Sequence, residues 1–319
     1  MVREPLHLDI ETRSEVDLKI YGAYVYFMHP STDILCAAYA FGDTGEPEIW
    51  LPNQPCPDAI MEHVKAGGQI VAWNAAFERQ GWNSILAPRY GWALPKLEQF
   101  MCTMAETLAM NLPGKLEDAA PALGLDVLKD DAGHRLMLKM CKPRKPRKDE
   151  PANALLWHES EEEKQRLYEY CKQDVRTEQA VGTRVLRLRP EEVRVFHLDA
   201  KINDRGVFID QTLCHYAKAV VNVEMDRLNK KMNAITGGEV GAATNVQQLA
   251  QYLEKNGVKT KTVAKDVITD LLILDIPDKC RAALEIRQEA AKTSTAKIDA
   301  MLKRRNADGR MRGNVQYHG

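Results

Sequence analysis

Hydrophobic and polar residues alternate at the start of the chain, which is typical of a half-buried β-strand. In residues 5–10, leucine and isoleucine take every second position and leave histidine and aspartate on the opposite face. Residues 34–41 form a second, nearly continuous apolar strand, and residues 48–51 return after a Gly-Asp-Thr-Gly turn. These three segments predict an antiparallel meander.

Downstream of the meander, helical and strand-like spacings alternate. A short helix is predicted over residues 58–66, a fourth strand over 69–73, and a helix from Ala75 onward, which indicates an α/β fold. Beyond residue 99 only helical spacing remains. Ser160 and Glu163 form a capping box that opens a long helix reaching about residue 188. Shorter helices are predicted over residues 103–110, 116–123 and 135–141.

The part of the chain after Pro190 is predicted to be almost wholly helical. Its helices are expected over residues 190–203, 211–235, 245–256 and 278–305. We expect the boundary between the two parts near residues 188–192. The α/β domain then covers residues 1–188, and a mostly helical segment covers residues 189–319.

Composition excludes several classes of protein. The seven cysteines of the 319-residue chain are scattered and form no CxxC pair, which argues against a zinc ribbon or a disulfide framework. No apolar run approaches the roughly 20 residues of a membrane span, and the N-terminus lacks the apolar core of a signal peptide. We therefore expect a cytoplasmic protein without a membrane partner.

Charge is distributed unevenly along the chain, although the net charge is only −1. Residues 255–319 contain fourteen Lys or Arg against eight Asp or Glu, so the preceding residues are acidic. An acidic front half and a basic tail suit a metal site joined to a segment that binds a polyanion. Chance asymmetry on solvated helices is the alternative.

Three acidic motifs fall on different predicted elements. Asp9 and Glu11 are two residues apart on the first strand, so both carboxylates point to one face. Glu78 lies in the first turn of a helix, and Tyr170 and Asp174 are one helical turn apart on the long helix. Carboxylates that converge from separate elements can hold two divalent ions for phosphodiester hydrolysis. Taken singly, each motif is also an ordinary surface feature.

Together, the motifs resemble those of the DnaQ-like DEDD exonucleases of the tyrosine subtype, which carry D-x-E, N-x-x-F-[DE] and Y-x-x-x-D in this order. The stretches DIETRSEVDL, NAAFERQGW, CTMAETLAMNLPGKLEDAAPALGL and CKPRKP are similar to family A DNA polymerases of bacteriophages. The later stretches NVQQLAQYLEKNG, ALEIRQEAAKTSTAKIDAML and DGRMRGNVQYHG resemble the thumb-side helices before the palm of those polymerases. The resemblance implies a ribonuclease H-like α/β exonuclease domain, with a mixed sheet flanked by helices, followed by a helical thumb-like segment.

The resemblance also implies an activity, which is hydrolysis of the 3′-terminal phosphodiester of DNA with two Mg²⁺ or Mn²⁺ ions. Asp9, Glu11 and Asp174 are expected to bind the first ion, with Asp9 bridging to the second. Glu78 stands where many of these exonucleases have Asp, and is expected to support the second ion through water. Tyr170 is expected to orient the attacking water.

Further residues are candidates for binding the substrate. Asn74 and the backbone near Thr12 are expected to seat the terminal nucleotide, whereas Phe77 is a candidate either for base stacking or for the core. The basic loop at residues 142–153 could hold the phosphates of a single strand, or could be an ordinary solvated loop. Its candidate phosphate-binding residues are Lys142, Arg144 and Lys145.

The expected partners are a single-stranded or frayed 3′ end of DNA and the palm and fingers part of a polymerase. In the family, the palm follows the point where this chain stops, so we expect a fragment or a split product without polymerase activity. If phage-encoded, it is expected in the host cytoplasm. An RNA-processing exonuclease and a non-catalytic DNA-binding module remain the alternatives.

Overall fold

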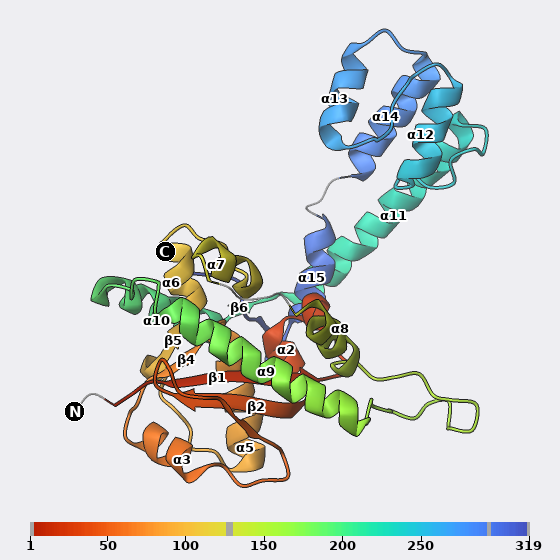
Figure 1. Cartoon of the computed structure of the whole chain (residues 1–319). Coiled ribbons are helices and arrows are strands. Elements are labelled where there is room, and N and C mark those ends of the chain that lie inside the picture. Colours follow the sequence, from red (N-terminus) through yellow and green to blue (C-terminus); the bar gives the residue numbers. More distant parts are fainter. Residues whose placement is uncertain (1–2, 126–129, 292–294, 318–319) are drawn as a thin grey trace. The chain divides into compact units, whose positions relative to one another are not determined.

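The computed structural model describes residues 3–125, 130–291 and 295–317. Its contacts divide the chain into two compact units (Figure 1). The first unit comprises Met1–Val207 together with Asn306–Gly319, and the second comprises Phe208–Arg305. Within the described residues, no helix has both the length and the apolar character needed to cross a membrane.

A five-stranded mixed sheet forms the centre of the first unit, in the order β3-β2-β1-β4-β5. The strands are β1 (Leu6–Arg13), β2 (Asp33–Phe41), β3 (Glu48–Trp50), β4 (Ile70–Ala72) and β5 (Phe100–Cys102). The pairs β1–β2 and β2–β3 are antiparallel, as the predicted meander requires, whereas β1–β4 and β4–β5 are parallel. The predicted α/β class with a mixed sheet is confirmed, and the arrangement is consistent with a ribonuclease H-like fold.

Two strands differ from the sequence-based prediction. β1 continues to Arg13, beyond the predicted residues 5–10, because β2 pairs with its whole length across a register shift between Glu11 and Thr12. β5 was not predicted, since only helical spacing was expected after residue 99. A three-residue strand is too short to show alternation, and its pairing with β4 comes from tertiary structure.

The two faces of β1 have different environments. Leu6, Leu8 and Ile10 belong to the main hydrophobic core, which also contains Phe27 and Trp82. Figure 1 shows α9 (Glu161–Gly182) lying across β1 and β2 on the sheet. The alternation of β1 directs His7, Asp9 and Glu11 toward this helix.

The helices of the first unit largely follow the predicted pattern. Ser160 is the N-cap of α9, as predicted, but its side chain makes no capping hydrogen bond, and the helix ends at Gly182 rather than near residue 188. The α-helices are α1 (Leu18–Tyr21), α2 (Ala23–Met28), α3 (Asp58–Lys65), α4 (Ala75–Gly81), α5 (Ala87–Tyr90), α6 (Thr103–Ala109), α7 (Leu116–Ala122), α8 (Asp131–Met140), α9 and α10 (Pro190–Arg205). A π-helical turn, Trp82–Leu86, and a 3₁₀ turn, Leu97–Gln99, complete the set.

Helix α10 packs into the first unit, so the contact division lies after the expected boundary at residues 188–192. His197 Nε2 lies 3.1 Å from the carbonyl oxygen of Phe100 in β5. At the end of the helix, Asp204 accepts two hydrogen bonds of 2.8 Å from the guanidinium of Arg79 in α4. The returning segment joins the same helix, because the Tyr317 hydroxyl donates to Glu192. These contacts unite residues that the boundary expected from sequence would separate.

The second unit is helical and has its own core. Its helices are α11 (Gln211–Ile235), α12 (Val246–Lys255), α13 (Lys265–Ile273), α14 (Asp278–Ala290) and α15 (Ala296–Arg304). Its buried residues include Leu228, Met232, Leu249, Leu253, Ile268 and Leu284. The single helix predicted over 278–305 is described as α14 and α15, and residues 292–294 lie outside the described residues. The short strands β6 (Val207–Phe208) and β7 (Arg310–Met311) form a separate two-stranded sheet.

Candidate active site

A cleft of about 470 Å³ lies where β1 and α9 face each other. Asp9 of β1 and both motif residues of α9, Tyr170 and Asp174, line this cleft. The strand spacing of two residues and the helix spacing of four residues explain the convergence, because each repeat keeps its side chains on one face. The structure therefore brings together three of the five residues proposed for catalysis from sequence in one cavity.

Burial and mutual repulsion govern the carboxylates of this cleft. Burial is the main cause that raises the pKa of Asp9 to about 6 and that of Asp174 to about 8, and the charge of Asp9 contributes to the shift of Asp174. Burial, followed by the charge of Asp9, also raises the pKa of Glu11 well above its usual range. Acidic groups in and beside one cleft that all resist ionisation are typical of a site that receives a cation.

Glu78 extends this acidic group from a different element. It lies in the first turn of α4, its residue is only 4% exposed, and burial and the charge of Asp9 raise its pKa well above the usual range. Within the described chain, its Oε2 atom is buried without a hydrogen-bond partner. A buried carboxylate oxygen without a partner is costly, and a divalent cation is a partner of suitable chemistry.

Tyr170 supplies a neutral hydroxyl among these acids. Burial, and then the negative charge of Asp174, raise the pKa of the phenol above its ordinary value. The hydroxyl therefore keeps its proton at neutral pH and can donate a hydrogen bond. This is the property required of a group that holds a water molecule beside carboxylates.

Cys171 is a site residue that the sequence motifs did not reveal. Its thiol donates to Oδ2 of Asp9 across 3.2 Å, and this bond opposes the effect of burial on the pKa of Asp9. Candidate ligand atoms of Asp9, Glu11 and Cys171 lie within 4.8 Å of one another. The sequence feature that could have indicated Cys171 is its position next to Tyr170, on the side of the helix that packs against the sheet.

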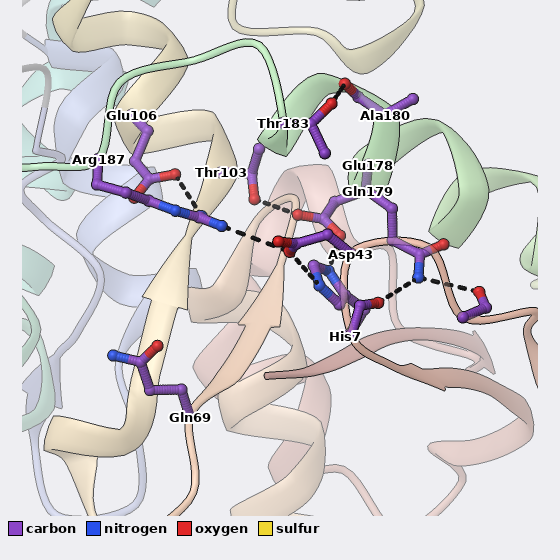
Figure 2. Close-up of polar contacts among 12 residues, drawn as sticks. His7, Asp43, Gln69, Thr103, Glu106, Glu178, Gln179, Ala180, Thr183 and Arg187 are labelled. Atoms are coloured by element: carbon purple, nitrogen blue, oxygen red, sulfur yellow. Dashed lines mark hydrogen bonds and ion pairs between the residues drawn. The ribbon is translucent and has the colours of Figure 1, made fainter. Parts of the chain in front are cut away.

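A second pair of residues also escaped the sequence motifs, namely His7 and Glu178. His7 Nδ1 lies 2.5 Å from Glu178 Oε2, and its other ring nitrogen lies 3.2 Å from Asp43 Oδ1. Figure 2 shows this group, with the Thr103 hydroxyl donating to the second oxygen of Glu178. Burial acts to lower the pKa of His7, but the hydrogen bonds and charges of the two carboxylates outweigh it and raise the pKa. Their spacing was the missed signal, since His7 precedes Asp9 by two residues and Glu178 follows Asp174 by four.

The residues expected to seat the terminal nucleotide are not among the described residues that line the cleft. Thr12 is buried, and its hydroxyl lies 2.8 Å from the Tyr26 hydroxyl. Asn74 is the exposed N-cap of α4, and its side chain makes no capping hydrogen bond. The Phe77 ring lies 4.8 Å from that of Phe27, so its observed contacts are those of a packing residue.

The basic loop at residues 142–153 also lies outside the set that lines the cleft. Arg144 makes two hydrogen bonds of 2.6 Å to Glu150, and a β-bridge joins it to Leu156. Lys142 Nζ lies 3.5 Å from Asp17 Oδ2, and Lys145 is exposed. The guanidinium of Arg144 is thus committed to holding the loop together.

Other cationic or titratable side chains line the cleft instead, namely Lys19, Lys115 and His134. Lys19 belongs to α1, Lys115 is the N-cap of α7, and His134 belongs to α8. No local spacing relates these three positions, so the sequence alone gave no reason to group them. Their common place on the cleft comes from tertiary packing.

Comparison with known proteins relates the chain to a phage DNA polymerase. No protein-family model matches the sequence. Over 323 residues, the chain is 34% identical to the protein named DNA polymerase of Bacillus phage SP02, and the match covers 98% of this chain and 48% of that polymerase. The chain thus spans about half the length of the curated relative it matches, and across nearly all of its own length it is similar to a phage DNA polymerase.

Proposed function

We propose that the chain is a metal-dependent 3′→5′ DNA exonuclease, of the proofreading type, and forms part of a phage replicative DNA polymerase. The observation that carries the proposal is the meeting of Asp9, Tyr170 and Asp174 on one cleft. Glu11 and Glu78 add buried carboxylates whose pKa values respond to the charge of Asp9. The similarity to a phage DNA polymerase supports DNA as the substrate class.

The donor set suits hard divalent ions such as Mg²⁺ or Mn²⁺. Asp9, Glu11 and Asp174 would hold one ion, and Asp9 and Glu78 would serve the second. When bound, the ions would neutralise the phosphate and lower the pKa of water. Among the described residues, the buried oxygen of Glu78 without a hydrogen-bond partner is one that a cation beside Asp9 would satisfy.

The remaining steps belong to the side chains of the protein. The protonated Tyr170 hydroxyl orients the attacking water toward the terminal phosphate. Hydrolysis adds water across the P–O3′ bond, releases a nucleoside 5′-monophosphate and leaves a new 3′ hydroxyl on the shortened strand. Lys19, Lys115 and His134 are placed to contact the phosphates of the strand that enters the cleft.

A nuclease assay on purified chain tests this proposal. A 5′-labelled single strand should shorten from its 3′ end with Mg²⁺ or Mn²⁺ and stay intact with chelator. Asp9→Ala and Asp174→Ala should each lower the rate by several orders of magnitude while circular dichroism shows a retained fold, since each removes a proposed metal ligand. Full activity in either folded variant would contradict the two-ion site.

Matched DNA and RNA strands separate the alternatives. An RNA-processing exonuclease would degrade RNA faster, whereas the relationship to a DNA polymerase favours DNA. A non-catalytic DNA-binding module would bind both strands without shortening either. The buried, mutually repelling carboxylates argue against this last alternative, because a passive surface gains nothing from them.

A further inference from the structure

We propose that His7 and Glu178 form a positioning pair that sets the spacing between β1 and α9, and thereby the affinity of the cleft for metal. This inference rests on the proposed function. His7, Asp9 and Glu11 occupy alternate positions of β1, and Tyr170, Asp174 and Glu178 occupy successive turns of α9. Within the described residues, the side-chain hydrogen bond that joins one row directly to the other is the one between His7 and Glu178.

The pair is tightly constrained on both sides. His7 is 0% and Glu178 is 3% exposed, and their joining atoms are 2.5 Å apart. The Thr103 hydroxyl of α6 donates a hydrogen bond to the other oxygen of Glu178, and Asp43 lies beside the other ring nitrogen of His7 (Figure 2). A buried, hydrogen-bonded pair of this kind fixes the relative position of the elements that carry it.

Glu178 lines the same cleft as Asp9 and Asp174, yet its contacts distinguish it from a ligand. Both of its oxygens accept hydrogen bonds from protein groups, whereas Glu78 retains a buried oxygen without a partner in the described chain. Glu178 lies one helical turn beyond Asp174, and His7 lies two residues before Asp9. A change in their separation therefore moves the two proposed metal ligands relative to each other.

The positioning role and a simple charge effect predict different results. If only charge mattered, Glu178→Gln would weaken metal binding by removing a carboxylate that lines the cleft, while His7→Gln, which removes no carboxylate, would not weaken it. If the pair positions the ligands, both variants weaken binding. Removing a residue that positions metal ligands without binding the metal itself typically lowers metal affinity by about 10-fold to 100-fold. We expect a loss in this range for each variant.

Mn²⁺ binding measured by electron paramagnetic resonance on the full chain gives a readout independent of nuclease activity. The double variant should lose little more than either single variant, because the two residues act as a unit. The matched control is His63→Gln, since His63 is also buried and its Nε2 lies 2.8 Å from the Gln69 carbonyl oxygen, but it belongs to α3 and not to either row. This control should bind Mn²⁺ as the wild type does.

Each outcome decides between the two roles. Unweakened binding by folded His7→Gln, unchanged binding by folded Glu178→Gln, or an equal loss in His63→Gln would overturn the positioning role. If Glu178→Gln does not fold, the measurement is made on His7→Gln. If neither variant folds while the control does, the pair is required for folding and the positioning role is overturned. Absence of Mn²⁺ binding in the wild type would contradict the proposed function itself.

Discussion

Single residues in the cleft are held in a state that favours protons over negative charge. Asp174 shows this most clearly, because burial and Asp9 raise its pKa to about 8 from an ordinary value of 3.8. Between these two values the folded protein keeps a proton that the unfolded chain releases. In the metal-free protein, the tighter binding of this proton therefore stabilises the fold fully at low pH. This stabilisation is lost as the pH rises toward 8.

We predict that Asp174→Asn stabilises the metal-free protein at pH 8, by on the order of 1 kcal/mol. The amide has nearly the same shape but never acquires the buried negative charge. Thermal unfolding in chelator at pH 5 and pH 8 measures the effect, and the advantage of the variant should be larger at pH 8. If the stability of the wild type relative to the variant instead increased with pH, Asp174 would be stabilised as an anion.

Tyr170→Phe tests the hydroxyl alone. We expect a loss of roughly 10²-fold or more in nuclease rate, the scale of a positioned acid–base group, with unchanged Mn²⁺ binding. The half-buried ring remains to pack, so folding should not change. Tyr168→Phe is the matched control, because Tyr168 lies on the same helix and packs toward the apolar cluster of β2. Equal rates for Tyr170→Phe and wild type would make Tyr170 a packing residue.

Among the elements, β1 and α9 explain which parts of the site could be predicted from sequence. The two-residue period of a strand and the four-residue spacing of a helix placed Asp9 with Glu11 and Tyr170 with Asp174. The same periods place His7 beside Asp9 and Glu178 beside Asp174, but neither reports which side chains pair between the strand and the helix, so Cys171 and the partner of His7 were missed. β5 was missed for a related reason, because its three residues become a strand only through pairing with β4.

The cleft-lining residues of α1, α7 and α8 lead to a prediction about DNA binding. Lys115→Met should weaken binding of a single strand several-fold and make the dependence of affinity on salt shallower, by about 0.7 in the logarithmic slope if one phosphate contact is lost. Fluorescence anisotropy with a phosphorothioate-protected strand measures both quantities. Lys145→Met is the matched control from the basic loop. If it weakened strand binding more than Lys115→Met does, the phosphate-binding site would lie on that loop.

At the scale of the whole molecule, the two compact units have separate hydrophobic cores. The main core of the first unit surrounds the sheet, and that of the second surrounds Leu228, Met232 and their neighbours. All five residues proposed to hold or serve the metal ions belong to the first unit. Metal binding should therefore be coupled to the unfolding of one unit only.

We predict that calorimetry resolves two unfolding transitions and that Mn²⁺ raises the midpoint of one of them. A ligand that binds only the folded state adds about 2.7 kcal/mol at one hundred times its dissociation constant, so the shift should be readily measured. Asp9→Ala should abolish the shift and leave the other transition unchanged. An equal shift of both transitions would show that the units unfold together.

The route of the chain through its two units has a consequence for synthesis on the ribosome. The first unit is discontinuous, because the chain leaves it after Val207 and returns at Asn306. The return is specific, since Arg312 Nε donates to the Asp204 carbonyl oxygen and Val315 N donates to the Asn203 side chain. The second unit is one uninterrupted stretch and is complete on the nascent chain before the first receives its last segment. The unit that begins first is therefore completed last, and the residues of its acidic cleft are on the nascent chain before its final contacts are made.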